Sequence, residues 1–555
     1  MRFHGLLTLA LAISAAASTA APTQSAAVFD WFEYRGADPL PQPRAGEYAN
    51  PILGGFYPDP SIVRVGGDFY MVNSTFSWFP GIPVFHSRDL VNWRQIGNAI
   101  DRPDQLDFKK LGISRGVFAP TIAHHAGTFY IVNTCVDCGG NFVITARNPA
   151  GPWSDPTFLP QVGGIDPSLF FDADRRTWIL NNDNPQGKPL YDGHRAIWIQ
   201  QFDPKSKTSF GPRKMLIDGG VDIAKKPVWI EGPHLYQHNG FYYLMAAEGG
   251  TSDQHSEVIF RSRDVLGPYV PWDANPILTQ RDLPEARRSP ITSTGHADIV
   301  QLADGAWWSV FLGTRPYEGD YYNTGRETFM LPVKWENGWP RITSTGQPIP
   351  YNHKKPALLQ TSGKPIYSRT MVARDEFTGK AIGPEWMMMR NPRERWHRLS
   401  GGALELKPRP VGLGDFGNPS FLARRQQHMY ATASTSVRFT PRSDSDRAGL
   451  AAIQNDEYWF ALSVARGRVV LERRAGPKDA ARGVIIASAP LSDAAGAPVY
   501  LRIKARGAFY DFAYAQKPGA WRTLRQGEDG RILSTKTAGG FVGTLIGPYA
   551  YTDAQ

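Results

Sequence analysis

Five segments in the N-terminal part of the chain share one pattern, and this repeat restricts the fold more than any other feature. Each segment has a short polar motif, a β-type run, a turn and an aromatic β-type run. The motifs begin at positions 59, 119, 166, 231 and 296, so the starts are spaced at similar intervals. Each interval has room for a four-stranded antiparallel sheet, and five such units predict a five-bladed β-propeller in an all-β protein.

The residues that open the repeats are candidates for a common site. In a propeller the first strand of each blade lies nearest the central axis, so equivalent ends of these strands converge on one funnel. Carboxylates gathered in a funnel repel one another, which raises at least one pKa and keeps a proton available near neutral pH. A single Asp-Pro at the start of a strand is more often a turn or a cap. Three carboxylates at equivalent positions favour catalysis instead, and the five opening residues are Asp59, Ala119, Asp166, Glu231 and His296.

Three of the motifs resemble the signature motifs of glycoside hydrolase family 43. They are Tyr57-Pro58-Asp59-Pro60-Ser61, Gly164-Ile165-Asp166-Pro167-Ser168 and Trp229-Ile230-Glu231-Gly232-Pro233-His234. The resemblance covers roughly residues 50–350, and we place the propeller domain at residues 46–346. It implies a five-bladed propeller of the exo-acting β-xylosidase and α-L-arabinofuranosidase branch.

The resemblance also implies roles for the three carboxylates. Asp59 would be the general base that activates water, and Glu231 the general acid that protonates the leaving oxygen. Asp166 would raise the pKa of Glu231 and orient it. The family inverts the anomeric configuration, a chemistry in which acid and base stand ~6.5–9.5 Å apart with the attacking water between them.

Four further residues are candidates for substrate binding. The resemblance implies that Arg326 contacts sugar hydroxyls; the alternative is a surface ion pair with Glu327. His296 would line the funnel floor, beside a bound cation in some relatives, or be a structural histidine. Trp78 and Phe118 would stack on a sugar ring, although a core role is equally open for Phe118. We expect no organic cofactor, and a structural calcium near His296 is the one metal that the resemblance suggests.

The last third of the chain predicts a second β domain. Residues 347–368 are rich in Pro, Lys and Gly and are predicted to be a linker. Residues 369–555 are predicted to form a concanavalin-like β-sandwich, with runs at Ala403–Leu406, Thr432–Phe439, Tyr458–Val464, Val469–Arg473, Val499–Ile503 and Ala508–Tyr514. Its start resembles the lectin-like domain often fused to such propellers, which packs on the propeller and lends a loop that narrows the pocket.

The net charge of +10 raises the question of a nucleic-acid partner. Residues 365–555 carry 28 Lys and Arg against 17 Asp and Glu, whereas residues 1–364 carry 33 against 34. A nucleic-acid enzyme concentrates positive charge around its active cleft. The predicted propeller is neutral and its motifs are acidic, so we expect no nucleic acid as partner.

The N-terminus predicts export. Arg2 precedes an apolar run from Leu6 to Ala17, which is shorter than the ~20 residues of a membrane span. Small residues follow, so residues 1–20 are predicted to be a signal peptide that sends the protein to the periplasm or the medium, with no membrane partner. In such a compartment Cys135 and Cys138 either form a short local disulfide or stay reduced.

The sequence thus predicts an exported, exo-acting, inverting glycosidase that releases terminal xylose or arabinose from xylan- or arabinan-derived oligosaccharides. One alternative is an α-L-arabinofuranosidase or arabinanase without xylosidase activity. Another is a non-catalytic propeller that only binds carbohydrate. The preferred pentose, the linkage and the oligomeric state stay open.

Overall fold

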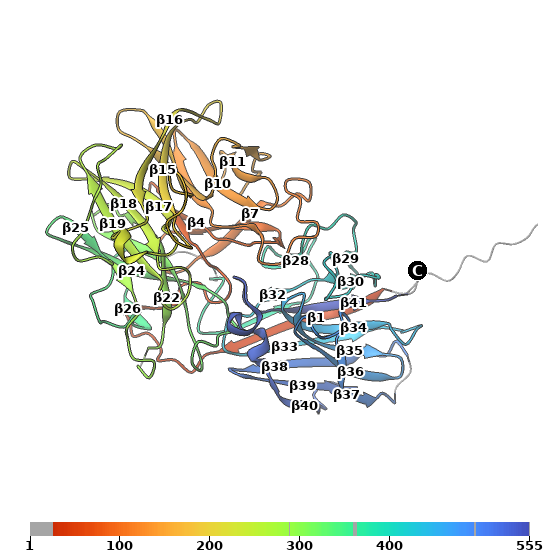
Figure 1. The fold of residues 1–555 in the computed structure, drawn as a ribbon. Helices are drawn as coiled ribbons and strands as arrows, with labels where there is room; N and C mark the ends of the chain where they lie inside the picture. The colour runs from red at the N-terminus through yellow and green to blue at the C-terminus, as the bar shows by residue number, and fades with distance from the viewer. Residues whose placement is uncertain (1–25, 288, 359–362, 364, 493–494, 554–555) are drawn as a thin grey trace, which may run out of the picture.

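The structure, a computed structural model, describes residues 26–287, 289–358, 363, 365–492 and 495–553. These residues form two β-rich bodies, a propeller and a sandwich, which confirms the predicted all-β class (Figure 1). The predicted signal peptide lies outside the described residues. Within them, no helix has both the length and the apolar character needed to cross a membrane.

Five antiparallel sheets make up the propeller, which confirms the predicted blade number. The innermost strands of successive blades contact one another in chain order, and the last also contacts the first, so the ring is closed. The first blade comprises β3 (Ser61–Val65), β4 (Asp68–Val72), β6 (Gly81–Ser87) and β7 (Arg94–Ile100), and the second comprises β8 (Gly116–Val117), β9 (Thr121–His125), β10 (Thr128–Val136), β11 (Gly140–Ala146) and β12 (Thr157–Phe158). The third comprises β13 (Ile165–Phe171), β14 (Thr177–Asp183), β15 (Ala196–Asp203) and β16 (Thr208–Asp218), and the fourth comprises β17 (Glu231–His238), β18 (Phe241–Glu248), β19 (Ser256–Ser262), β20 (Val270–Pro271) and β21 (Leu278–Thr279). The fifth comprises β22 (Thr292–Gln301), β23 (Trp307–Thr314), β24 (Glu327–Glu336) and β25 (Trp339–Arg341).

A buried carboxylate joins the fifth blade to the first. Asp298, on β22, accepts hydrogen bonds from Ser61 Oγ at 2.7 Å and from the Ile62 amide at 2.9 Å, both on β3. Tyr236 Oη donates to its other oxygen at 2.6 Å. A buried charge is costly unless it is hydrogen-bonded. These hydrogen bonds satisfy Asp298 and at the same time join the last blade of the ring to the first.

The C-terminal body is a sandwich of two antiparallel sheets with an apolar core between them. One sheet has the order β29 (His397–Ser400), β30 (Ala403–Leu406), β1 (Ala27–Ala37), β33 (Tyr430–Arg438), β38 (Val499–Arg506), β39 (Phe509–Ala515) and β40 (Arg522–Asp529), with β27 (Thr370–Asp375) beside β1. The other has β31 (Ser420–Phe421), β41 (Leu545–Tyr551), β34 (Arg447–Asn455), β35 (Tyr458–Ala465), β36 (Arg468–Ala475) and β37 (Val484–Pro490), with β32 (Arg424–Arg425) beside β41. Two short helices, η2 (Gly530–Leu533) and α1 (Thr535–Ala538), precede β41.

The first described strand belongs to this sandwich and not to the propeller. In Figure 1 the red β1 runs among the blue strands of the C-terminal domain. β1 pairs with β33 and β30, and its side chains Phe29, Phe32 and Tyr34 enter the sandwich core. The sandwich predicted for residues 369–555 therefore lacked one of its inner strands, because the pairing partners lie on opposite sides of the propeller sequence and no local pattern reveals them.

Two short pairings fix the segments between the domains. β2 (Glu47–Ala49) pairs with β26 (Asn352–Lys354), which lies inside the predicted linker. β5 (Trp78–Phe79), from the first blade, pairs with β28 (Met388–Met389) of the second domain. A further 3₁₀ turn, η1 (Ile223–Lys225), lies between β16 and β17. The predicted linker thus contains a strand of its own, and the β5–β28 pairing joins the two domains directly.

A buried arginine links β1, the fifth blade and the sandwich. Arg315 Nη1 lies 2.5 Å from Asp38 Oδ2, and its Nε and Nη2 donate to Glu327 at 2.6 and 2.8 Å. We expect Arg315→Met to lower the free energy of unfolding by about 3–5 kcal/mol, because it leaves two buried carboxylates without a counter-charge. Urea unfolding measures the loss. Arg398→Met is the control, because it removes only an exposed ion pair with Glu405 and should cost little stability. A loss for Arg315→Met as small as that of the control would contradict the prediction.

Candidate active site

The innermost strands of three blades begin with a β-bulge that turns the backbone. Asp166 and His296 have φ of 54° and 51°, and Gly232 has φ of 58° at the same point of its blade. Asp59, just before β3, has φ of 52°. A left-handed backbone conformation is uncommon for residues other than glycine. Its repetition at the funnel indicates a shared local conformation that directs side chains toward the central axis.

Glu231 does not occupy the position equivalent to Asp166, so that expectation is wrong. The bulge registers align Glu231 with Ile165 and Gly295, and align Gly232 with Asp166 and His296. The physical reason is space, since a Cβ on Gly232 would stand 2.9 Å from the His296 ring. The fourth blade therefore supplies its carboxylate from the preceding residue.

The structure nevertheless brings the three carboxylates together. Asp59, Asp166 and Glu231 line one cavity of about 820 Å³ at the funnel. His296 and Arg326 line the same cavity, as predicted from the motifs. These side chains come from four different blades, so positions that are far apart in the sequence become neighbours in space.

Asp59 is held as a carboxylate. Burial is the largest influence on its pKa and acts to raise it, but Arg326, the His296 ring and a hydrogen bond from Ser74 together hold the pKa below its usual value. Ser74 Oγ donates at 2.5 Å, and Arg326 Nη1 lies 3.4 Å from Asp59 Oδ1. An ionised carboxylate at neutral pH is the state that a general base requires.

Glu231 and Asp166 are held toward their protonated forms. Burial, and then the charge of Asp59, raise the pKa of Glu231 to about 7. Burial and the charges of Glu231 and Asp59 also raise the pKa of Asp166 well above its usual value, although Asp166 accepts a hydrogen bond from the Gly232 amide at 3.1 Å. The two carboxyls therefore share a proton near neutral pH, and their titration belongs to the pair.

We expect Asp166→Asn to shift the alkaline limb of the pH profile of kcat/KM to lower pH. Because the two carboxyls share a proton, Asp166 carries a negative charge while Glu231 holds that proton, and asparagine removes this charge, so that Glu231 loses its proton more readily. Activity that requires protonated Glu231 is thus lost at a lower pH than in the wild type. Initial rates measured from about pH 4 to about pH 9 check this, because that range extends about two units above the pKa of Glu231. An alkaline limb that stays at the wild-type pH would contradict the coupling between Asp166 and Glu231.

Three phenylalanines form an apolar wall of the cavity, and two of them, Phe76 and Phe541, flank Arg326. Phe76 and Phe541 stack with centroids 5.6 Å apart, and Phe118 meets Phe541 edge-on at 5.8 Å. The Arg326 guanidinium lies 5.2 Å from the centre of the Phe541 ring. Phe541 belongs to the sandwich domain, between α1 and β41, and its amide donates to Ser114 Oγ at 2.9 Å. The second domain thus lends a loop to the pocket.

Arg326 points into the site and not to the surface. Its Nη1 donates to Thr251 Oγ1 at 2.7 Å, while Glu327, the alternative surface partner, is buried against Arg315. The Nε of Arg326 is buried and has no hydrogen-bond partner among the described residues. The Arg326 guanidinium as a whole lines the cavity, where its charged N–H donors are suited to ligand oxygens.

Trp78 does not reach the cavity, and the prediction that it stacks on a sugar is wrong. Its side chain is fully buried, and its ring lies 6.4 Å from that of Phe421 in the sandwich domain. The β5–β28 pairing draws this residue into the interface between the domains. Phe118, by contrast, lines the cavity and also packs on Phe76, so it has a packing role, and its stacking on a sugar stays a prediction.

His296 borders the cavity in its neutral form. Burial lowers the pKa of His296 to about 4, so the ring is uncharged near neutral pH. The part of the chain that the structure describes contains no group of three or more His, Cys, Asp or Glu side chains placed to hold a metal ion. A structural calcium near His296 stays a prediction, and we derive no catalytic step through a cation.

Several residues of the cavity carry no recognisable motif. Thr251 and Phe541 contact Arg326, but both stand in irregular segments outside the repeated motifs. Arg195 and Trp229 stack on one another at the cavity wall, with the guanidinium 4.1 Å from the ring centre. Only Trp229 had a signal in the sequence, since it opens the third signature motif.

A short disulfide stands beside the cavity. Cys135 and Cys138 are joined at the turn between β10 and β11. Val136, inside the disulfide loop, lines the cavity, and Asp137 pairs with Arg115 at 2.6 Å. Of the two states open from the sequence, the structure has the oxidised one.

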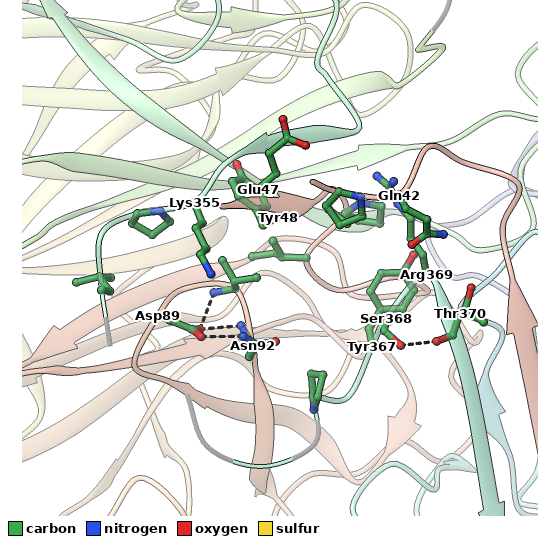
Figure 2. Close-up of a pocket in the computed structure, with 18 residues that line it drawn as sticks. Gln42, Glu47, Tyr48, Asp89, Asn92, Lys355, Tyr367, Ser368, Arg369 and Thr370 are labelled. Atoms are coloured by element: carbon green, nitrogen blue, oxygen red, sulfur yellow. Dashed lines mark hydrogen bonds between the residues drawn. The ribbon is translucent and has the colours of Figure 1, made fainter. Parts of the chain in front are cut away.

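A second cavity of about 350 Å³ lies away from the carboxylates. Figure 2 shows it between β2, the segment between the domains and the loop after β6. Asp89 faces it, but this carboxylate accepts hydrogen bonds from the Val91 and Asn92 amides at 3.0 and 2.8 Å. The Asp89 carboxylate therefore stabilises its own loop, and we place no chemistry in this cavity.

Comparison with known proteins decides the family. The profile described as "Glycosyl hydrolases family 43" matches residues 48–340. The chain belongs to glycoside hydrolase family 43. A second profile, "Beta xylosidase C-terminal Concanavalin A-like domain", matches residues 374–555. This family 43 protein is therefore a glycoside hydrolase with a concanavalin-like second domain, as the motifs predicted.

Individual relatives align with this family 43 protein over most of its length. A "Xylosidase/arabinosidase" from Butyrivibrio fibrisolvens is 38% identical over 518 residues, which cover 91% of this chain and 96% of the relative. A "Non-reducing end alpha-L-arabinofuranosidase" from Bacteroides ovatus is 37% identical and covers 92% of each. The crystal structure of a GH43_12 protein from a capybara gut metagenome has a TM-score of 0.88 at 40% identity, covering 96% of this chain and 100% of that one.

Proposed function

We propose that this protein is an exo-acting, inverting glycosidase that releases terminal xylose or arabinose from xylan- or arabinan-derived oligosaccharides. The observation that carries the proposal is the opposite protonation of two carboxyls in one cavity. Asp59 is held ionised, whereas Glu231 is held protonated near neutral pH. A base and an acid that differ in this way are what single displacement by water requires.

Each carboxyl then has a defined task. Asp59 accepts a proton from water as the water attacks the anomeric carbon, and Ser74 and Arg326 keep that carboxylate in place. Glu231 donates its proton to the departing glycosidic oxygen, so that the bond breaks to give an alcohol. In this proposal Arg326 and Phe118, which both line the cavity, hold the terminal sugar by hydrogen bonds and by apolar contact.

The relatives support a pentose as the released sugar. Their printed names include xylosidase/arabinosidase and α-L-arabinofuranosidase, at 38% and 37% identity. Release of p-nitrophenol from the β-xylopyranoside and the α-L-arabinofuranoside tests the proposal, and we expect turnover of at least one. If neither is cleaved while the protein still binds xylan, the protein is a binding module. The apolar segment before residue 20 supports export, which N-terminal sequencing of secreted protein would test.

A further inference from the structure

The arginines around the cavity differ in how their charge is balanced. Arg326 pairs with Asp59 at 3.4 Å, and Arg115 pairs with Asp137 at 2.6 Å. Arg195 forms no ion pair with any carboxylate of the described residues. Its guanidinium instead stacks on Trp229, and its Nη1 donates to the His194 carbonyl at 2.9 Å. The positive charge of Arg195 therefore has no fixed partner among the residues that the structure describes.

The other acid on this part of the wall does not balance Arg195. Asp183 lines the cavity but lies 2.9 Å from Arg213, which also donates to Asn181. Glu231 is close enough for its titration to respond to Arg195. In its working state, however, Glu231 is protonated and neutral. Arg195 then carries an uncompensated charge at the wall of a cavity, and an anionic ligand group would be attracted there.

The place of Arg195 determines which part of a substrate it meets. The proposed acid, Glu231, contacts the oxygen that joins the terminal sugar to the rest of the glycan. Arg195 lies just before β15 and lines the same cavity as Glu231, where it stacks on Trp229, two residues before Glu231 in the chain. If the proposed function is correct, on which this step rests, Arg195 borders the leaving-group side of the cleaved bond.

We propose that Arg195 and Trp229 form a subsite for a carboxylate carried by the leaving-group sugar, as in uronic-acid-substituted pentose oligosaccharides. A guanidinium presents parallel N–H donors that match a carboxylate, and this fork remains free when one N–H is used by His194. Stacking on Trp229 fixes the orientation of the guanidinium plane. Less side-chain entropy is therefore lost when a carboxylate binds to Arg195.

Two substrates that differ only in charge test the subsite. One is xylotriose with a glucuronosyl group on its middle sugar, and the other is the methyl ester of the same uronate. We expect wild-type kcat/KM to be about tenfold higher or more for the free acid at low salt, as one charge-assisted contact implies. The advantage should shrink as NaCl is raised. Equal kcat/KM for acid and ester in the wild type would overturn the subsite.

Two variants at one position complete the test. Arg195→Gln should remove the preference for the acid while the ester is still cleaved, and Arg195→Lys should keep part of it because the charge remains. A preference that survives in Arg195→Gln, or an equal loss on acid and ester, would contradict carboxylate recognition. Failure of the wild type on the ester, on xylotriose and on both p-nitrophenyl pentosides would instead contradict the proposed function, and the subsite with it.

Discussion

Glu231→Gln should lower kcat on xylobiose by about 10²–10⁴-fold and leave the release of p-nitrophenol from an aryl pentoside nearly unchanged. The amide has the size of the carboxyl but no acidic proton, so an alkoxide would have to leave unprotonated. p-Nitrophenolate needs no such help, because it is stable at the pH of the assay. Initial rates on both substrates measure the effect.

The same variant should lose the alkaline limb of the pH profile, since the pKa of Glu231 is raised to about 7 and this carboxyl is the group that must stay protonated. Circular dichroism and the melting temperature control for folding. An equal loss on xylobiose and on the aryl pentoside would rule out an acid role for Glu231.

Asp59→Ala should lower activity on both kinds of substrate by about 10³-fold or more, because every substrate needs an activated water. The matched variant Ser74→Ala keeps the carboxylate and removes only its 2.5 Å hydrogen bond. We expect Ser74→Ala to lose far less activity, because Arg326 still holds Asp59 ionised.

Azide gives this prediction a second readout. A small anion that fills the space of the lost carboxylate can attack the anomeric carbon without a general base. Aryl pentoside turnover by Asp59→Ala should therefore rise with azide and yield a glycosyl azide, which mass spectrometry detects. Unchanged activity of the variant without azide would show that Asp59 is not the base.

Local sequence predicted the propeller because each blade repeats a short, self-contained pattern. The motif, the turn and the aromatic run follow one another closely along the chain, so β-type periodicity and turn residues suffice to place them. The same locality revealed Asp59, Asp166 and Glu231. It did not reveal that Glu231 lies one residue before the position equivalent to Asp166, because that depends on the His296 ring filling the space beside Gly232.

Contacts between the domains could not be predicted in this way. β1 pairs with strands that follow the whole propeller in the sequence, and Phe541 enters a cavity whose other walls lie in the propeller. Trp78 misled the prediction for the same reason. It stands in a motif near the site, and only the pairing of β5 with β28 shows that the sandwich covers it.

The stereochemistry of the first product molecules tests the central proposal most directly. Proton NMR of xylobiose hydrolysis resolves the two anomers of the released sugar before they interconvert. Asp59 acting through water on the face opposite Glu231 predicts that α-xylose from the β-linked substrate accumulates first. β-Xylose as the first product would mean retention through a covalent intermediate, and would contradict the roles of both carboxylates.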